Sequence, residues 1–327
     1  MCSRTMQSAA AAAGVLVLLA LLFTINPPSD QAWQRVCLDA SHGPIFAAIA
    51  VILAVWPASR TGRREPVPWP DWVRGGEAFA LAVVIGILVE LLQSLQDRPP
   101  SLFDVFTDAA GAAAGLAIWS LLSRPRPGAP EAGDHSMAWT LVAIALAGIT
   151  FVGWRPLHAA IAYAGRAASF PVIAQFRSPR DLYFVATEGA AADIVAMPAP
   201  WSQQAGERAL RLAFDTRHAP ALQILEPGPD WRGYSVVAAE LTNPSDAELQ
   251  LTFRIFDATH DWSPEDRLNL PLVIAPRTRT TVRVALGVVE AAPAGRSMDL
   301  SRVANVTIFG RQGEAPGELY VSRLWLE

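Results

Sequence analysis

The segment Glu90–Gly115, ELLQSLQDRPPSLFDVFTDAAGAAAG, joins the end of one long apolar run to the start of another. Pro99 and Pro100 mark a turn inside it, so the two runs are expected to form a helical hairpin. Acidic, amide and arginine side chains stand directly beside stretches whose composition suits lipid. Because ionisable groups are costly in a membrane, the segment predicts a membrane hairpin that carries a polar site.

Five apolar runs predict about five transmembrane helices. A helix that spans a bilayer needs about 20 mainly apolar residues, with about 17 as a lower limit. The runs are Ser8–Ile25, Gly43–Trp56, Gly76–Leu95, Asp104–Leu122 and Met137–Trp154. The second run is short unless it extends upstream to Cys37. The first is expected to remain as a helix, because no small-x-small cleavage site for a signal peptide follows it.

Arginines in the loops predict the orientation of these helices. One set of loops contains Arg4, Arg60, Arg63, Arg64, Arg74, Arg124 and Arg126, and the alternate loops contain Arg35 and Arg98. This excess places the first set of loops, and the N-terminus, in the cytoplasm. With five spans, everything after Arg155 lies outside. We therefore expect a multi-pass protein of a bacterial inner (plasma) membrane with a periplasmic, extracytoplasmic C-terminal domain.

Composition divides the chain into a membrane part and a soluble part. Of the 327 residues 52% are apolar, yet nearly all long apolar runs precede Trp154. We expect a transmembrane helical domain over residues 1–155, an interfacial segment or linker over 156–180, and a soluble domain over 181–327. The net charge of −4 offers no basic surface for nucleic acid. The only cysteines, Cys2 and Cys37, exclude a disulfide framework and a structural zinc site, and we expect no cofactor or metal.

Polar residues at the outer ends of the predicted helices are expected to form one layer at the outer membrane face. The layer consists of Asp39, His42, Glu90, Gln93, Arg98, Asp104 and Asp108. Glu90 and Gln93 share one face of the third helix. Asp104 and Asp108 begin the fourth helix, whose N-terminus favours carboxylates. Arg98 lies in the turn between them, within reach of both acid pairs.

The order of these residues resembles the signature of the VanZ-like membrane family. In that signature Glu-x-x-Gln is followed by Arg, by Asp six residues later, by a polar residue four further on, and by two glycines. The matching residues are Glu90, Gln93, Arg98, Asp104, Gly111 and Gly115. Asp39 and His42 resemble the family's acidic and histidine positions, whereas Asp108 stands where the family usually has Asn.

The resemblance covers about residues 10–125 and implies a helical membrane module. VanZ itself is associated with resistance to the glycopeptide antibiotic teicoplanin. Independently of the family, the spacing of Gly111 and Gly115 predicts that another helix approaches closely there.

Three interpretations of the polar layer stay open. In the first, Arg98 neutralises the acids and holds the hairpin together. In the second, the layer binds an anionic or hydroxyl-rich headgroup. In the third, Glu90, Asp104 and His42 act as acid and base in catalysis. The sequence contains no nucleophile elbow and no H-E-x-x-H motif, so binding is favoured over enzymatic activity.

From Asp181 onward, apolar and polar residues alternate with the period of a strand. The segments are RALRLAFD (208–215), GYSVVAAELTN (233–243), ELQLTFRIFD (248–257), RTTVRVAL (279–286), VANVTIFG (303–310) and LYVSRLWLE (319–327). Turn-forming clusters such as EPGPD and NPSD separate them. The expected fold class is therefore multi-domain, with an α-helical transmembrane bundle followed by an all-β antiparallel sandwich or jelly roll.

The pattern over Asp181–Glu327 resembles the galactose-binding-like jelly rolls used as carbohydrate-binding modules, and this resemblance implies sugar binding. Aromatic faces stack on sugar C–H surfaces, while acids and arginines hydrogen-bond to hydroxyl groups. The candidate glycan-binding residues are Asp257, His260, Asp261, Trp262, Asp266, Arg267 and Trp231, with Arg232 beside the last.

Other roles for the same residues stay open. Trp262 could fill the core, and Asp266 with Arg267 could brace the loop. Asp257, Asp261 and Asp266 could instead hold calcium, although they lack the register of an EF-hand.

These observations predict a membrane protein that recognises a cell-envelope glycan or a lipid-linked precursor at the outer membrane face. A link to glycopeptide antibiotic resistance or to polysaccharide export would follow. The alternatives are a membrane-embedded enzyme that acts on a lipid-linked sugar, and a structural partner of an export machine. The expected partners are the lipid bilayer and an envelope glycan or polysaccharide, and not nucleic acid.

Overall fold

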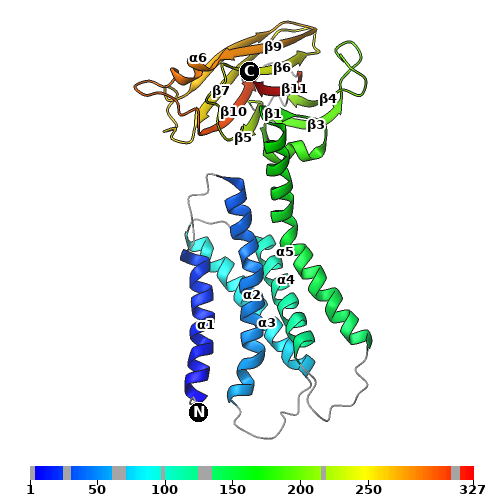
Figure 1. Ribbon diagram of the computed structural model, residues 1–327, viewed down its shortest axis with the longest axis vertical. Helices are drawn as coiled ribbons and strands as arrows, with labels where there is room; N and C mark the ends of the chain where they lie inside the picture. The colour runs from blue at the N-terminus through cyan, green and yellow to red at the C-terminus, as the bar shows by residue number, and fades with distance from the viewer. Residues whose placement is uncertain are drawn as a thin grey trace. The chain divides into compact units, whose positions relative to one another are not determined.

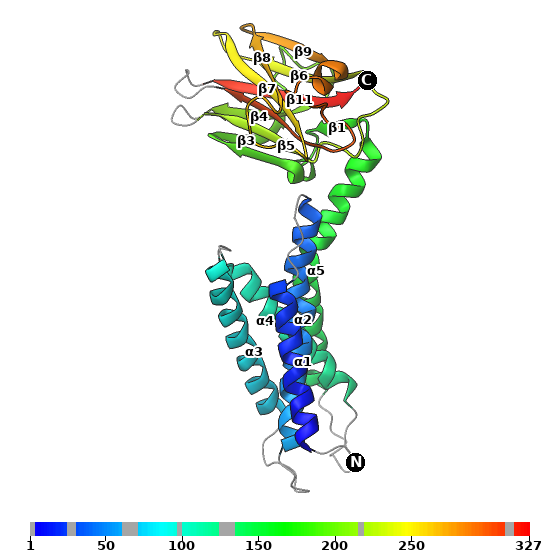
Figure 2. The ribbon, with the colours of Figure 1, turned by 90° about the vertical axis from the view of Figure 1, so that its left-hand side faces the viewer.

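The computed structural model describes residues 4–24, 31–60, 71–96, 100–123, 135–214, 219–310 and 317–327. The chain forms two compact units, Met1–Ala160 and Ile161–Glu327. The first is helical and the second consists mainly of strands (Figures 1 and 2). Their boundary lies inside a helix, whereas the sequence places it between residues 155 and 181. Most of the segment 156–180 is regular structure, because the helix that contains Pro156 ends only at Ser169 and a strand covers Val172–Gln175.

Five α-helices make up most of the first unit. They are α1 (Arg4–Thr24), α2 (Ala32–Arg60), α3 (Asp71–Gln93), α4 (Leu102–Leu122) and α5 (His135–Ser169), with a 3-10 turn, η1 (Ser94–Gln96), after α3. Four described helices are long and apolar enough to cross a membrane, where the sequence predicts about five: Ala32–Trp56, Arg74–Gln93, Leu102–Leu122 and Trp139–Ser169.

The difference between four and five lies in the first two apolar runs. The apolar part of α1, Ala9–Thr24, is shorter than the other four helices. The second run, which by itself is short, extends upstream to Ala32 because the polar residues before it continue the same helix. Large apolar side chains such as Leu81, Leu88 and Leu92 are exposed along α3. Such a surface is unusual for a protein in water and suits lipid.

Small residues bring α2 and α4 into close contact. A Cβ atom added at Gly111 would lie 2.1 Å from the carbonyl oxygen of Gly43, and one at Gly115 would lie 2.7 Å from the Cα of Ala47. The prediction that a helix approaches these glycines is therefore confirmed, and that helix is α2. Phe46 of α2 is fully buried beside this contact.

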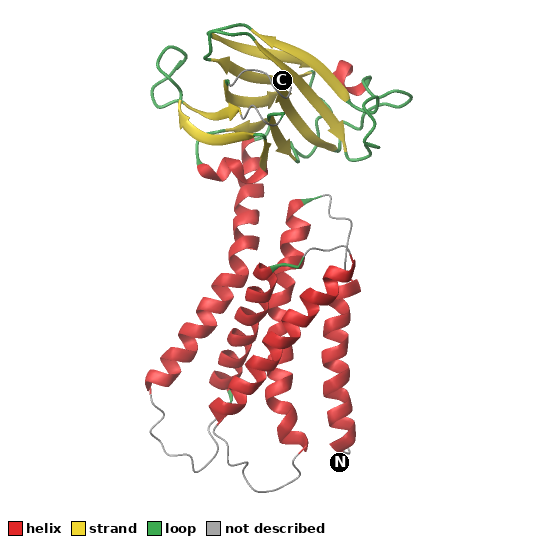
Figure 3. Ribbon diagram, turned by 180° about the vertical axis from the view of Figure 1, so that it is seen from behind, coloured by secondary structure: helices red, strands yellow, loops and turns green. Residues whose placement is uncertain are grey.

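The second unit is a sandwich of two antiparallel sheets (Figure 3). Its strands are β1 (Val172–Gln175), β2 (Val185–Glu188), β3 (Ala190–Ala196), β4 (Arg208–Phe214), β5 (Ala221–Leu225), β6 (Val236–Asn243), β7 (Leu249–Asp257), β8 (Leu268–Ile274), β9 (Thr278–Ala285), β10 (Val303–Gly310) and β11 (Glu318–Leu326). A 3-10 helix, η2 (Pro179–Phe184), precedes β2, and a short helix, α6 (Leu286–Glu290), follows β9.

One sheet has the order β3-β4-β11-β6-β9, with β1 paired to β11, and the other has the order β2-β5-β10-β7-β8. Side chains at alternate positions, such as Leu210, Leu241, Phe253 and Ile255, meet between the sheets. The antiparallel sandwich expected from the alternation is therefore present. The sequence analysis does not predict five of the strands, namely β1, β2, β3, β5 and β8. Three of these have only four or five residues, which is too short for a clear alternation.

Candidate functional site

The loop of residues 258–267 connects β7 to β8, two neighbouring strands of the five-stranded sheet. Arg296 fastens both ends of this loop. Its guanidinium bonds the carboxylate of Asp257 at 2.6 and 2.9 Å and that of Asp266 at 2.5 and 2.9 Å. Paired hydrogen bonds between a guanidinium and a carboxylate are strong and geometrically specific. Ion pairs with one residue far along the chain, the partly exposed Arg296, therefore hold both ends of the loop.

The carboxylates of these ion pairs are held in their charged form. Hydrogen bonds from Arg296 lower the pKa of Asp266 to about 2. Burial raises the pKa of Asp257, but bonds from Arg296, from the Asp299 amide and from Thr259 outweigh that effect, so its pKa lies below the ordinary value. Both carboxylates are buried and already bonded. Asp257 and Asp266 therefore brace the loop, and Arg296, which the sequence does not single out, takes the bracing role considered for Arg267.

Trp262 lies at the exposed tip of the same loop, between its two ends. The residue is 76% exposed, and its backbone has φ +70°, a conformation that bulky residues rarely adopt. The backbone amide of Asp261 donates to Asp266 Oδ2 at 2.9 Å, and that of Ser263 donates to Asp261 Oδ1 at 2.8 Å. These bonds impose the turn that carries Trp262 outward.

Three rings form what we call the aromatic site, consisting of Phe256, His260 and Trp262. Ring centroids lie 4.8 Å apart for Phe256 and His260, 5.4 Å for His260 and Trp262, and 6.1 Å for Phe256 and Trp262. The His260 side chain is almost fully buried, and its Nδ1 lies 2.9 Å from the carbonyl oxygen of Asp266. Its Nε2 has no hydrogen-bond partner among the described residues. The indole of Trp262 thus packs against the Phe256 and His260 rings on one side and is open to solvent on the other.

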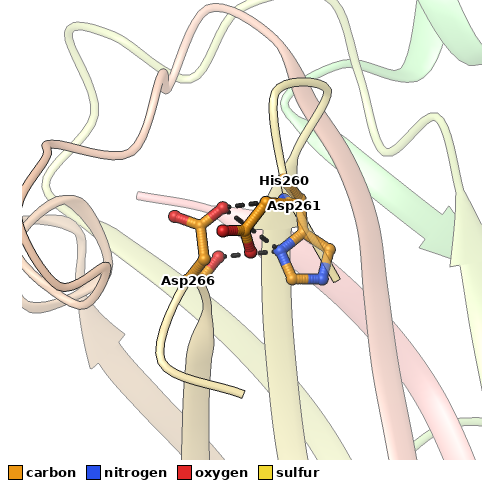
Figure 4. Close-up of side chains that lie close together, drawn as sticks. All are labelled: His260, Asp261 and Asp266. Carbon is orange, nitrogen blue, oxygen red and sulfur yellow. Dashed lines mark hydrogen bonds and ion pairs between the residues drawn. The ribbon is translucent and has the colours of Figure 1, made fainter. Parts of the chain in front are cut away.

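His260, Asp261 and Asp266 bring possible metal-ligand atoms within 4.8 Å of one another (Figure 4). However, Asp266 already accepts bonds from Arg296 and from the Asp261 amide. A cation bound there would have to compete with a guanidinium for the same oxygens. The same competition applies to calcium at Asp257. This geometry favours a hydrogen-bonded brace over a metal centre.

The remaining sugar candidates differ in their surroundings. Trp231 is 0% exposed and packs in the sandwich core, so the prediction that it contacts sugar is corrected. Its neighbour Arg232 is exposed and pairs with Asp230 at 2.6 Å. Arg267 lines an open depression of about 730 Å³ together with Asn269, and its Nε lacks a partner among the described residues.

The outer surface of the five-stranded sheet adds residues that the sequence does not single out. Arg254 Nε donates to Asn269 Oδ1 at 2.8 Å, and its guanidinium lies 4.3 Å from the centre of the Phe309 ring. Asn269 in turn donates to the carbonyl oxygen of Pro264 at 3.1 Å. Burial, followed by the nearby charge of Arg267, lowers the pKa of Arg254. The period-two alternation of β7 places Arg254 on the same face as Phe256 and could have indicated this surface.

The polar layer of the helical unit is present in part. His42 Nδ1 lies 3.0 Å from Asp108 Oδ1, and both side chains are buried. Glu90 Oε2 accepts the Ser101 amide at 2.6 Å, and Ser101 caps α4 by accepting the Asp104 amide at 3.2 Å. The structure thus brings the second, third and fourth helices together around these groups.

Two further members of the predicted layer are Asp39 and Arg98. Asp39 pairs with Arg155 of α5 at 3.3 Å, at a partly exposed position. Arg98 lies outside the described residues, so its predicted bonds to the acids stay a prediction. Asp108, which stands where the VanZ-like signature usually has Asn, is the residue that contacts His42.

No model of a known protein family matches the chain, and no curated protein sequence matches it. The VanZ-like resemblance of the helical half therefore has no support from these comparisons. The C-terminal sandwich does resemble solved carbohydrate-binding structures. A family 11 carbohydrate-binding module from Clostridium thermocellum, solved with a β-1,3-1,4-mixed-linked tetrasaccharide, is 9% identical with a TM-score of 0.33, over 44% of this chain and 88% of the module.

Two further structures show the same level of similarity. A family 29 carbohydrate-binding module in complex with cellulohexaose is 10% identical with a TM-score of 0.30, over 47% of this chain and 86% of the module. An exo-β-agarase is 14% identical with a TM-score of 0.36, over 44% of this chain. The matched region spans only 23% of the agarase. At these values the likeness concerns the sandwich fold, and the case for a ligand rests on the site itself.

Proposed function

We propose that this protein is a membrane-anchored receptor that binds a cell-envelope glycan through the aromatic site of its sandwich. The observation that supports the proposal is the position of Trp262. Trp262 is 76% exposed, and an indole that two other rings support suits stacking against the C–H surface of a sugar. An exposed tryptophan without such a function would leave apolar surface in water.

The groups beside the aromatic site suit a neutral or weakly acidic glycan. Arg254 and Asn269 form a hydrogen-bonded pair on the same sheet face, and Arg267 lines the depression next to it. Amide and guanidinium groups donate hydrogen bonds to hydroxyl or carboxylate oxygens. A single sugar contact of this kind is weak, so useful affinity would come from repeated glycan units or from several membrane-bound copies.

The arginine bias supports an extracytoplasmic position for the sandwich. Arg63 and Arg64 lie between α2 and α3, and Arg124 and Arg126 lie between α4 and α5. If both connections are cytoplasmic, α5 crosses outward and the sandwich lies outside. This count starts at α2, so it holds whether or not α1 crosses the membrane. A reporter that is active only outside the cytoplasm, fused after Glu327, should therefore be active, and cytoplasmic activity would refute the placement.

The full chain in nanodiscs should bind envelope glycans on an array, with the mixed-linked tetrasaccharide and cellulohexaose as additional probes. Trp262→Ala should abolish this binding and leave the melting temperature within about 1–2 °C, because the side chain makes few buried contacts. Trp325→Ala, on the opposite sheet, is the matched control and should bind like the wild type. Retained binding by Trp262→Ala would refute the site. If the wild type binds no glycan, a structural partner of an export machine becomes the better proposal.

A further inference from the structure

A second buried polar group lies between three helices of the N-terminal unit. We define the bundle cluster as His42 of α2, Glu90 and Gln93 of α3, and Asp108 of α4, all of which are buried. A Cβ atom added at Gly86 would lie 2.6 Å from Asp108 Oδ2, so this carboxylate reaches across to α3, one turn before Glu90. Glu90 also interacts electrostatically with both His42 and Asp108. His42, Glu90 and Asp108 therefore lie close together, and Gln93 follows Glu90 by three residues on the same face of α3.

Several polar atoms of the bundle cluster have no hydrogen-bond partner among the described residues. These atoms are Glu90 Oε1, Asp108 Oδ2 and both amide atoms of Gln93. Gln93 is only 3% exposed, so bulk water does not cover it. Buried polar groups in folded proteins nearly always have partners, and an unpaired one is unfavourable. Several unpaired atoms on two neighbouring helices therefore indicate a binding site, at which a ligand supplies the missing hydrogen bonds.

The unpaired atoms define the chemistry of that ligand. Three of them accept hydrogen bonds, namely Glu90 Oε1, Gln93 Oε1 and Asp108 Oδ2, whereas Gln93 Nε2 is the one donor. Two of the acceptors belong to carboxylates, so the cluster attracts positive charge. A primary ammonium group carries three N–H donors and a positive charge, which matches this set.

The location of the cluster suits a lipid. Gln93 is the last residue of α3, and Asp108 lies in the second turn of α4, so the cluster is near one end of two candidate membrane spans. Headgroups begin at this depth of a bilayer. We propose that the bundle cluster binds the primary ammonium group of an amine-bearing lipid headgroup. The proposal rests on the membrane placement given above, but it concerns a different site from the aromatic one and does not require glycan binding.

The test uses the full chain in micelles of a short-chain phosphatidylcholine, to which phosphatidylethanolamine is added in increasing mole fractions. Phosphatidylcholine carries the same charge on nitrogen but has no N–H donor, so it should not complete the site. Added phosphatidylethanolamine should bind saturably and raise the melting temperature by about 3–6 °C. Free ethanolamine forms a separate arm. If it also stabilises the protein, the site takes soluble amines, and if it does not, the acyl chains contribute to binding.

Two variants connect the effect to the cluster. Glu90→Gln keeps the acceptor for the Ser101 amide and removes the charge, and it should weaken phosphatidylethanolamine binding at least about tenfold. Gln93→Leu removes the unpaired amide, so the lipid-free protein should melt at the same temperature or higher, while the response to phosphatidylethanolamine is lost. Ser120→Ala, at an exposed position of α4, should behave like the wild type.

Three results would overturn the proposal. One is equal stabilisation by phosphatidylcholine and phosphatidylethanolamine. Another is a response that does not saturate, which marks lipid that merely surrounds the helices. The third is a normal response in both Glu90→Gln and Gln93→Leu. If the wild-type protein bound no glycan, the proposed function would fail, but none of these lipid measurements would change.

Discussion

Arg296 and Asp257 form a two-fold hydrogen-bonded ion pair, at 2.6 and 2.9 Å, although 39 residues separate them in the chain. The same guanidinium bonds Asp266, which stands at the other end of the loop that carries Trp262. One side chain from the segment between α6 and β10 therefore determines how the aromatic site is presented.

Removing this guanidinium should destabilise the sandwich strongly. Arg296→Ala leaves two buried carboxylates without their cation, and we expect the melting temperature of the domain to fall by roughly 5–10 °C. Arg277→Ala is the control, because Arg277 and Asp246 form an ion pair at the surface, where such pairs contribute little. Differential scanning calorimetry measures both. Equal small effects would show that the ion pairs of Arg296 do not hold the loop.

The ion pairs of Arg296 with Asp257 and Asp266 also predict that the stability of the sandwich depends on pH. The pKa of Asp266 in the folded protein is about 2, below its ordinary value of 3.8, and the pKa of Asp257 is also lowered. A group with a lowered pKa stabilises the fold above its ordinary pKa, and that contribution is lost as pH falls toward the folded value. Stability should therefore decrease between about pH 4 and pH 2. Arg296→Ala should show a shallower decrease over this range, and an unchanged profile in the variant would contradict the assignment.

The place where the soluble domain begins can be tested by truncation. Strand β1 pairs with β11. Near the end of α5, the Tyr163 hydroxyl donates a hydrogen bond to the Glu226 carboxylate, and the Arg166 guanidinium donates one to the backbone carbonyl oxygen of Glu226. A fragment of residues 161–327 should fold with a cooperative thermal transition. A fragment of residues 181–327 lacks these contacts and leaves the β11 edge open, so it should melt at a lower temperature or aggregate. Circular dichroism with temperature compares them, and equal melting temperatures would show that β1 is dispensable.

The contact between α2 and α4 predicts the effect of one added methyl group. In Gly111→Ala the new Cβ would lie 2.1 Å from the Gly43 carbonyl oxygen, so the helices must separate, at a cost of about 1–3 kcal/mol. Gly76→Ala is the matched control, because nothing lies within 4 Å of its added Cβ. Thermal unfolding of the full chain in detergent measures the difference. If the two variants melt at the same temperature, the close approach is not what holds these helices.

Local patterns in the sequence were sufficient for the class of each half. Long apolar runs indicated the helices, because a membrane span requires a certain apolar length. Alternation indicated β4, β6, β7, β9, β10 and β11, because successive side chains of a strand point to opposite faces. The spacing of Gly111 and Gly115 predicted a close helix contact for the same local reason.

Only the tertiary structure decided which distant residues meet. Trp231 and Trp262 look alike as sugar contacts in the sequence, yet one is in the core and the other is exposed, because burial depends on which strands cover a position. The bracing partner of Asp266 is Arg296, 30 residues away, and not the adjacent Arg267. In the helical half, His42 meets Asp108 because glycines let α2 and α4 approach, and which helices become neighbours is a property of packing that periodicity along one chain segment does not encode.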